Sequence, residues 1–148
     1  MYQRILLTLD LVHPDTQTRA VTAAVDLARA FGATLHVLTV VPDFGMSLVG
    51  GFFPKGFERK AREEARKALH AFTAARIPAD VTLQHVVGHG TIYEEILRVA
   101  GEVRADLIVM ASHRPELADY LLGPNAARVV RHATVSVLVV RPPPGEPA

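Results

Sequence analysis

The sequence predicts an α/β fold: an open, five-stranded parallel sheet with helices on both faces. Five short apolar runs alternate along the 148 residues with four amphipathic, helix-like segments, a pattern typical of βαβ units. The runs are rich in Val, Ile and Leu, as expected for strands buried on both faces. Right-handed crossovers, with a reversal of winding after the third strand, favour the strand order 3-2-1-4-5.

The first βαβ unit occupies the first 41 residues. An apolar run at Ile5–Leu9 predicts a strand that ends before Asp10. A helix should begin at Pro14-Asp15-Thr16, with Asp15 as its N-cap, and end at Gly32. Leu35–Val41 is the second predicted strand.

Pro42 to Gly56 is predicted to be a long loop with glycine and proline near both ends and an apolar middle. A long apolar loop is uncommon and suggests a lid or an interface. A loop folded back onto its own domain is an equally good interpretation.

The central part of the chain carries two helices around a third strand. Phe57 to Arg76 is a charged helix with one apolar side, and Val81–Val87 is predicted to be a strand. Thr91 and Glu94 have the spacing of a capping box at the start of a helix that continues to about Val103. We interpret the glycine-rich loop just before this helix as structural, because the third strand should lie at the edge of the sheet.

Ala105–Arg141 forms the last βαβ unit. Its predicted strands are Leu107–Met110 and Val135–Val140, and its helix is Ala126–His132. A Gly123-Pro124 break precedes the helix, with Gly123 suited to the N-cap and Pro124 to the first helical position. The loop therefore leaves the carboxyl end of a strand and leads into a helix start, where open parallel sheets bind ligands.

Composition excludes several classes of function. The formal net charge is +1 with scattered basic residues, so nucleic-acid and membrane partners are not expected. The chain has no cysteine and no metal-ligand spacing among its histidines, so no metal site is expected. No signal peptide or membrane-spanning run is visible, and we expect a cytoplasmic protein with one domain, residues 1–142, and a short tail, residues 143–148.

The last unit carries residues that are recognisable together. They are the turn Ala111–Pro115, the run Tyr120–Gly123, the helix Ala126–Ala133 and the strand Ser136–Arg141. On these residues the chain resembles the universal stress protein family over nearly its whole length. Its Ser-His-Arg-Pro turn looks like one sub-branch of that family. The resemblance implies a Rossmann-like fold of the adenine nucleotide alpha hydrolase type and a pocket for ATP, AMP or ADP, with or without magnesium.

The nucleotide-binding members of the family carry Gly-x-x-Gly, nine residues, and then Gly followed by Ser or Thr. In this chain Ala111 and Arg114 stand in the first two glycine positions, only eight residues precede Gly123, and Pro124 replaces the Ser or Thr. Arg114 adds a charge that can pair with phosphate. We therefore expect nucleotide binding that is weakened rather than abolished.

The resemblance, together with the charge of Arg114 and the amides at the helix start, suggests a role for each candidate site residue. Asp10 would contact the adenine or the ribose. It is available for this contact because Asp15 can cap the helix. The alternative is that Asp10 only forms the turn at the end of the strand. The remaining candidates each have an ordinary structural interpretation as well. They are Val40, whose backbone would pair with adenine; Met110 and Ala111, beside the ribose; His113 and Arg114, at the phosphates; and Gly123, Asn125 and Ala126, at the helix start.

No catalytic residues are expected. The sequence lacks a Walker-type phosphate loop and a Gly-x-Ser-x-Gly nucleophile elbow. We therefore expect this protein to have, at most, a slow ATP hydrolysis activity. In this family the last strand commonly forms a two-fold dimer, which implies a homodimer through Val135–Val140, with a tetramer through Phe44–Phe53 as an extension. The alternatives to a nucleotide-binding stress-response module are a nucleotide-free dimeric interaction protein and a weak ATPase.

Overall fold

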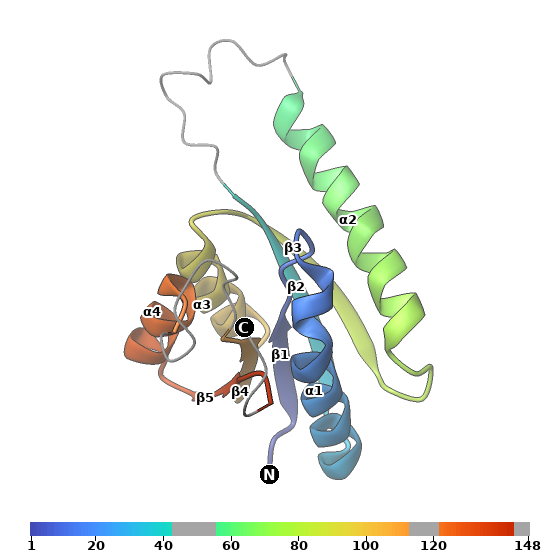
Figure 1. Cartoon of the computed structure of the whole chain (residues 1–148), viewed down its shortest axis with the longest axis vertical. Helices are drawn as coiled ribbons and strands as arrows, with labels where there is room; N and C mark the ends of the chain where they lie inside the picture. Colours follow the sequence, from blue (N-terminus) through green and yellow to red (C-terminus); the bar gives the residue numbers. More distant parts are fainter. Residues whose placement is uncertain (43–55, 113–121, 144–148) are drawn as a thin grey trace.

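Figure 1 shows the computed structural model of the chain, in which a twisted parallel sheet lies between two pairs of helices. The structure describes residues 1–42, 56–112 and 122–143. The strand order is β3-β2-β1-β4-β5 with parallel pairing throughout, which confirms the predicted topology. The elements in chain order are β1 (Arg4–Thr8), the 3₁₀ helix η1 (Pro14–Gln17), α1 (Thr18–Phe31), β2 (Thr34–Pro42), α2 (Phe57–Arg76), β3 (Leu83–Gly90), α3 (Ile92–Glu102), β4 (Leu107–Ala111), α4 (Pro124–His132) and β5 (Ser136–Val140).

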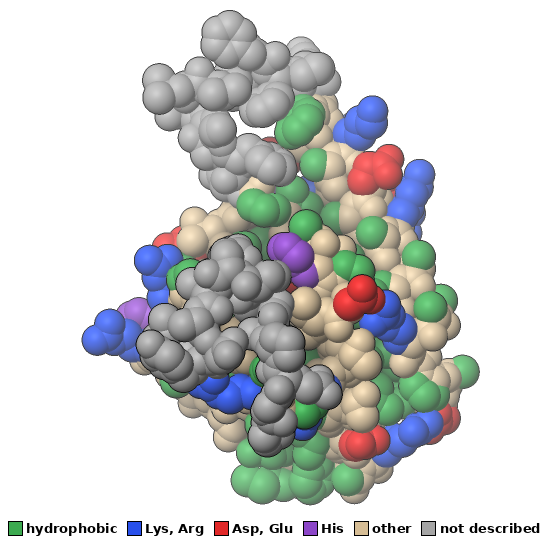
Figure 2. Space-filling view, viewed as in Figure 1, with side chains coloured by type: hydrophobic (Ala, Val, Ile, Leu, Met, Phe, Trp, Pro, Cys, Tyr) green, Lys and Arg blue, Asp and Glu red, His purple; other side chains and the backbone are tan. Residues whose placement is uncertain are grey.

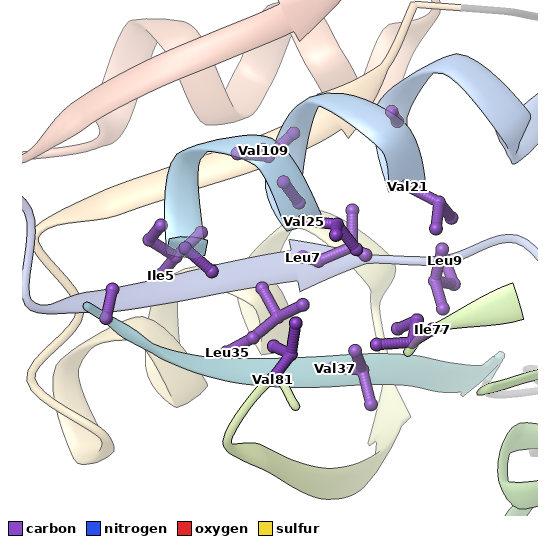
Figure 3. Close-up of a cluster of buried hydrophobic side chains, with 14 of the residues drawn as sticks. Ile5, Leu7, Leu9, Val21, Val25, Leu35, Val37, Ile77, Val81 and Val109 are labelled. Carbon is purple, nitrogen blue, oxygen red and sulfur yellow. The ribbon is translucent and has the colours of Figure 1, made fainter. Parts of the chain in front are cut away.

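Two apolar layers hold the sheet, because successive strand residues point to opposite faces. α1 and α2 cover one face, where β1 contributes Ile5 and Leu7. α3 and α4 cover the other face, where β1 contributes Leu6. Figure 3 shows the first layer, in which Val21 and Val25 of α1 pack on the strands. Burial of each of these aliphatic side chains stabilises the fold by about 1.5–3 kcal/mol.

The charged residues lie outside these layers. α2 buries only Leu69, Phe72 and Thr73 and leaves its charged residues exposed, as its pattern predicted. Figure 2 shows Lys and Arg interspersed with Asp and Glu along the side of the molecule that α2 forms. None of the described helices combines the length and the apolar character needed to cross a membrane.

The start of α1 differs from the prediction. Asp15 is not an N-cap, because residues Pro14–Gln17 form a 3₁₀ turn and α1 begins only at Thr18. Gln17 occupies the N-cap position of α1 without a side-chain hydrogen bond there. The carboxylate of Asp15 lies instead 3.9 Å from the guanidinium of Arg76 on α2. Pro14 starts the 3₁₀ turn, and Asp15 therefore lies inside this turn and not at the start of α1.

The capping box at α3 is also not formed. Thr91 is the N-cap with extended backbone angles, as predicted, but its side chain makes no capping hydrogen bond. Glu94, which a capping box would turn back toward Thr91, accepts a hydrogen bond from the Tyr93 hydroxyl at 3.3 Å. Glu95 reaches back instead, and its Oε1 accepts the N–H of His89 at 3.1 Å.

Two helix ends use left-handed backbone. Gly32 ends α1 with φ 64° and donates its N–H to Ala28, which confirms the predicted stop. α3 ends in the same way at a non-glycine residue, Arg104, with φ 56°. The N–H of Ala105 reaches the carbonyl of Ala100 at 2.9 Å across this turn. Of the predicted loop Pro42–Gly56, residues 43–55 lie outside the described residues, as do residues 144–148 of the predicted tail 143–148.

Candidate functional site

The central strands β1 and β4 lie side by side, and the chain leaves them toward opposite faces of the sheet. β1 leads to α1 on one face, and β4 leads to α4 on the other. Leu7 pairs with Val109, so Asp10 and Ser112 each follow three residues later at the same edge of the sheet. Open parallel sheets bind ligands outside the carboxyl ends of their strands, at such a change of winding.

The β1–α1 turn, residues 10–17, is closed by its own polar groups. The N–H of Asp10 donates to Oε1 of Gln17 at 3.1 Å, and Gln17 is buried. Gln17 in turn donates to the hydroxyl of Thr16 at 2.7 Å. That hydroxyl donates to the carbonyl of His13 at 2.7 Å. The sequence folds in this way because His13 precedes Pro14, whose ring fixes the entry into η1.

Asp10 lies at the start of this turn with both carboxylate oxygens engaged. Its Oδ1 accepts the N–H of Val12 at 3.0 Å, and its Oδ2 lies 2.9 Å from Nδ1 of His13. The side chain is nevertheless 50% exposed. A carboxylate has about four acceptor positions, so two remain for a ligand. Asp10 is therefore a turn-forming residue with acceptor capacity left over.

His13 is not among the predicted site residues, although its imidazole ring lies next to Asp10. Its side chain is 41% exposed and makes the hydrogen bond to Asp10. The signal that could have found it is the spacing Asp-x-x-His followed by proline, which lets one turn fold the ring back onto the carboxylate.

The end of β4 is joined to the start of α4. Met110 is buried and Ala111 is half-buried. The N–H of Ser112 donates to the carbonyl of Val140 at 3.0 Å, and the carbonyl of Ser112 accepts the N–H of Gly123 at 3.4 Å. These bonds keep the first turn of α4 beside the strand ends, although ten residues separate Ser112 from Gly123 in the chain.

The start of α4 confirms the predicted arrangement. Gly123 is the N-cap and Pro124 is the first helical residue. Ala127 makes the first intrahelical bond, to the carbonyl of Gly123 at 3.0 Å. The N–H groups of Asn125 and Ala126 belong to the first turn, where a helix has no acceptors of its own. Together with the helix dipole they favour a bound anion.

The end of β2 borders the same edge of the sheet. Leu9 donates its N–H to the carbonyl of Leu38 at 2.8 Å, and the hydroxyl of Thr39 donates to the carbonyl of Leu9 at 3.1 Å. Val40, whose backbone was the predicted adenine contact, follows directly and is half-buried. Two of the predicted phosphate contacts, His113 and Arg114, lie outside the described residues.

The glycine-rich segment Gly88–Gly90, predicted as a loop after a strand that ends at Val87, is instead the end of β3 and pairs with β2. Glu95 accepts the N–H of His89 and forms an ion pair with Arg98 at 2.7 Å. The hydrogen bond to Arg98, followed by that to His89, lowers the pKa of Glu95 against the opposing effect of burial. β3 is an edge strand, as predicted. Among the described residues, no group of three or more His, Asp or Glu side chains is placed to hold a metal ion.

These features define a Rossmann-like α/β protein in which β1 and β4 end side by side at a change of winding. The family model described as the universal stress protein family matches residues 1–141. The chain therefore belongs to the universal stress protein family.

Relatives and solved structures agree with this assignment. Universal stress protein G of Shigella flexneri is 31% identical over 143 residues, which cover 95% of this chain and 100% of that protein. A universal stress family protein of Burkholderia pseudomallei, 29% identical, superposes with a TM-score of 0.72 and covers 95% and 97% of the two chains.

Two more distant structures share the fold and contain nucleotides. One is a universal stress protein in complex with cAMP, 23% identical with a TM-score of 0.62 over 95% of this chain and 97% of its own. The other is a universal stress protein from Archaeoglobus fulgidus in complex with dAMP, 18% identical with a TM-score of 0.60 over 95% and 98%.

Proposed function

We propose that this protein is a stress-response regulatory module that binds an adenine nucleotide, ATP or AMP, where β1 and β4 end. One observation carries the proposal: a half-exposed carboxylate, Asp10, and the first turn of α4 flank the same switch point of the sheet. Asp10 offers acceptors to a nucleoside, and the helix start favours the phosphates. The cAMP and dAMP complexes of two family members support this assignment.

Pro124 determines which nucleotide we expect. It has no N–H, so the first turn of α4 offers one donor fewer to a phosphate. A hydrogen bond to a charged group is worth about 1.5–3 kcal/mol. The amides of Asn125 and Ala126, with the side chain of Arg114, are the remaining phosphate contacts in this proposal. We therefore expect AMP to bind about as well as ATP, with magnesium helping only the triphosphate.

Equilibrium dialysis with ATP and with AMP tests this function. Asp10→Ala should weaken both ligands at least about tenfold, equivalent to about 1.4 kcal/mol. Asp15→Ala is the matched control, because Asp15 lies in the same turn, carries the same charge and is fully exposed. Absence of uptake by the parent protein at millimolar ligand, or equal loss in the two variants, would contradict the proposal. In that case the protein would be a nucleotide-free interaction module.

A second observation favours self-association. β5 is an edge strand with an unpaired side, and its Leu138 is 37% exposed. Exposed apolar edges pair readily with another strand, so we infer a homodimer through β5. Leu138→Lys should then produce a monomer in sedimentation velocity, whereas Val130→Lys, at an exposed position on α4, should leave the dimer intact. A monomeric parent at micromolar concentration would rule the dimer out.

From the regulatory role we also infer a cytoplasmic location.

A further inference from the structure

We propose that His13 is a positioning residue for the nucleoside: its ring holds the Asp10 carboxylate in the orientation from which Asp10 contacts the ligand. This inference rests on the proposed nucleotide site and concerns a residue that lies outside the predicted contact set. It follows from the geometry of the β1–α1 turn.

The two oxygens of Asp10 have separate anchors. Oδ1 is held by the N–H of Val12 at 3.0 Å, and Oδ2 by Nδ1 of His13 at 2.9 Å. The terminal torsion of an aspartate is otherwise broad. Held at only one oxygen, a half-exposed carboxylate samples several orientations. Held at both, it presents its two remaining acceptor positions in one direction.

His13 can act as an anchor because its own backbone is fixed. Its N–H donates to the carbonyl of Asp10 at 3.3 Å. Its carbonyl accepts both the N–H of Thr16, at 3.1 Å, and the hydroxyl of Thr16, at 2.7 Å. Pro14 follows directly. The buried side chain of Gln17 accepts the N–H of Asp10 within the same turn. The ring of His13 and the carboxylate of Asp10 therefore belong to one rigid unit.

The contact also fixes which ring nitrogen must donate. A carboxylate oxygen only accepts, so Nδ1 of His13, which faces Oδ2 of Asp10, must carry a proton for this bond to form.

Calorimetric titration with AMP and with adenosine tests the role of His13. His13→Ala should weaken both ligands about three- to tenfold, the effect of one hydrogen bond. The two losses should be alike, because both ligands carry the nucleoside that Asp10 contacts.

Two further variants make the test specific. His13→Asn places an amide N–H near the position of Nδ1 and should restore the binding that His13→Ala loses. Val12→Ala changes an 82% exposed side chain of the same turn and keeps the backbone anchor, so it should bind like the parent protein.

Each result decides between the proposals. If the parent binds AMP and His13→Ala binds it equally well, the positioning role is wrong and the nucleotide site stands. If only AMP is weakened and adenosine is not, His13 acts on the phosphate and the positioning role is again wrong. If Val12→Ala is weakened as much as His13→Ala, the turn as a whole is responsible and the positioning role of His13 is wrong. If the parent binds neither ligand, both proposals fail.

Discussion

The ring of His85 on β3 stacks on the ring of His70 on α2, with centroids 3.8 Å apart and planes inclined by 19°. Nε2 of His85 also lies 2.7 Å from the hydroxyl of Thr73. Burial, and then the neighbouring His70, lowers the pKa of His85 below its ordinary value. His85 resists protonation in this arrangement, because its charge would be partly removed from water and would lie close to the ring of His70.

The first prediction is that acid destabilises the protein. Unfolded histidine binds its proton near pH 6.5, and folded His85 binds it only at lower pH, so the unfolded chain holds more protons in between. The stabilisation is complete above the unfolded pKa and is lost as the pH falls through the folded pKa. Urea unfolding between pH 7.5 and pH 5 should show this loss. His85→Gln should reduce it, and the exposed His132→Gln should leave it unchanged.

The second prediction concerns His36, which is 6% exposed on β2. Within the described part of the chain neither of its ring nitrogens has a hydrogen-bond partner, and burial, followed by the charge of Arg4, lowers its pKa. An unsatisfied buried polar group costs about 1–3 kcal/mol. His36→Leu should therefore raise the free energy of unfolding by about that amount and lessen the acid sensitivity. His36→Ala should lower it by leaving a cavity. A destabilised His36→Leu would show that the ring is satisfied in solution.

The third prediction is that Arg104→Gly stabilises the protein. Arg104 has φ 56°, and left-handed backbone costs a residue with a side chain about 1–2 kcal/mol relative to glycine. Glycine loses part of this gain because it is more flexible in the unfolded chain, so we expect about 1 kcal/mol in thermal or urea unfolding. Arg104→Ala removes the same charge without relieving the backbone and should show no such gain. Equal stabilisation by both variants would point to the charge instead.

The fourth prediction compares two glycines. A Cβ at Gly88 would lie 3.1 Å from Oε1 of Glu95, so Gly88→Ala should displace that carboxylate and weaken its bonds to His89 and Arg98. We expect a loss of about 1–2 kcal/mol in the free energy of unfolding, since a partly buried hydrogen-bonded charge is disturbed.

The matched variant is Gly101→Ala in α3. Nothing lies within 4 Å of a Cβ at this position, and alanine in a helix is favoured over glycine by about 0.5–1 kcal/mol. Gly101→Ala should therefore stabilise the protein in the same urea unfolding experiment. If both variants lose stability, the contact of a Cβ at position 88 with Glu95 is not the reason why this position requires glycine.

Local sequence signals worked well where the physics is local. α2 was predicted at Phe57–Arg76 and lies at those residues, because its apolar positions recur at helical spacing over 20 residues. Gly32 and Gly123-Pro124 were placed correctly because a left-handed stop and a proline start depend on backbone conformation alone. Asp15 is not a cap because Pro14 starts a 3₁₀ turn and α1 begins only at Thr18. Thr91 is the predicted N-cap of α3, but the capping box does not form, because its side chain makes no capping hydrogen bond and Glu95 rather than Glu94 reaches back.

By itself the sequence determined the element order, the sheet topology and the edge of the sheet at which the chain leaves β1 and β4. Burial patterns and crossover handedness act on whole elements, so these properties survive small errors in element ends. Only the tertiary structure decided which side chains interact: His13 bonds to Asp10, His85 stacks on His70, and the ring of His36 has no hydrogen-bond partner among the described residues. Such contacts depend on strand register and on the path of each turn to within an ångström or so, and residue spacing does not encode them at that scale.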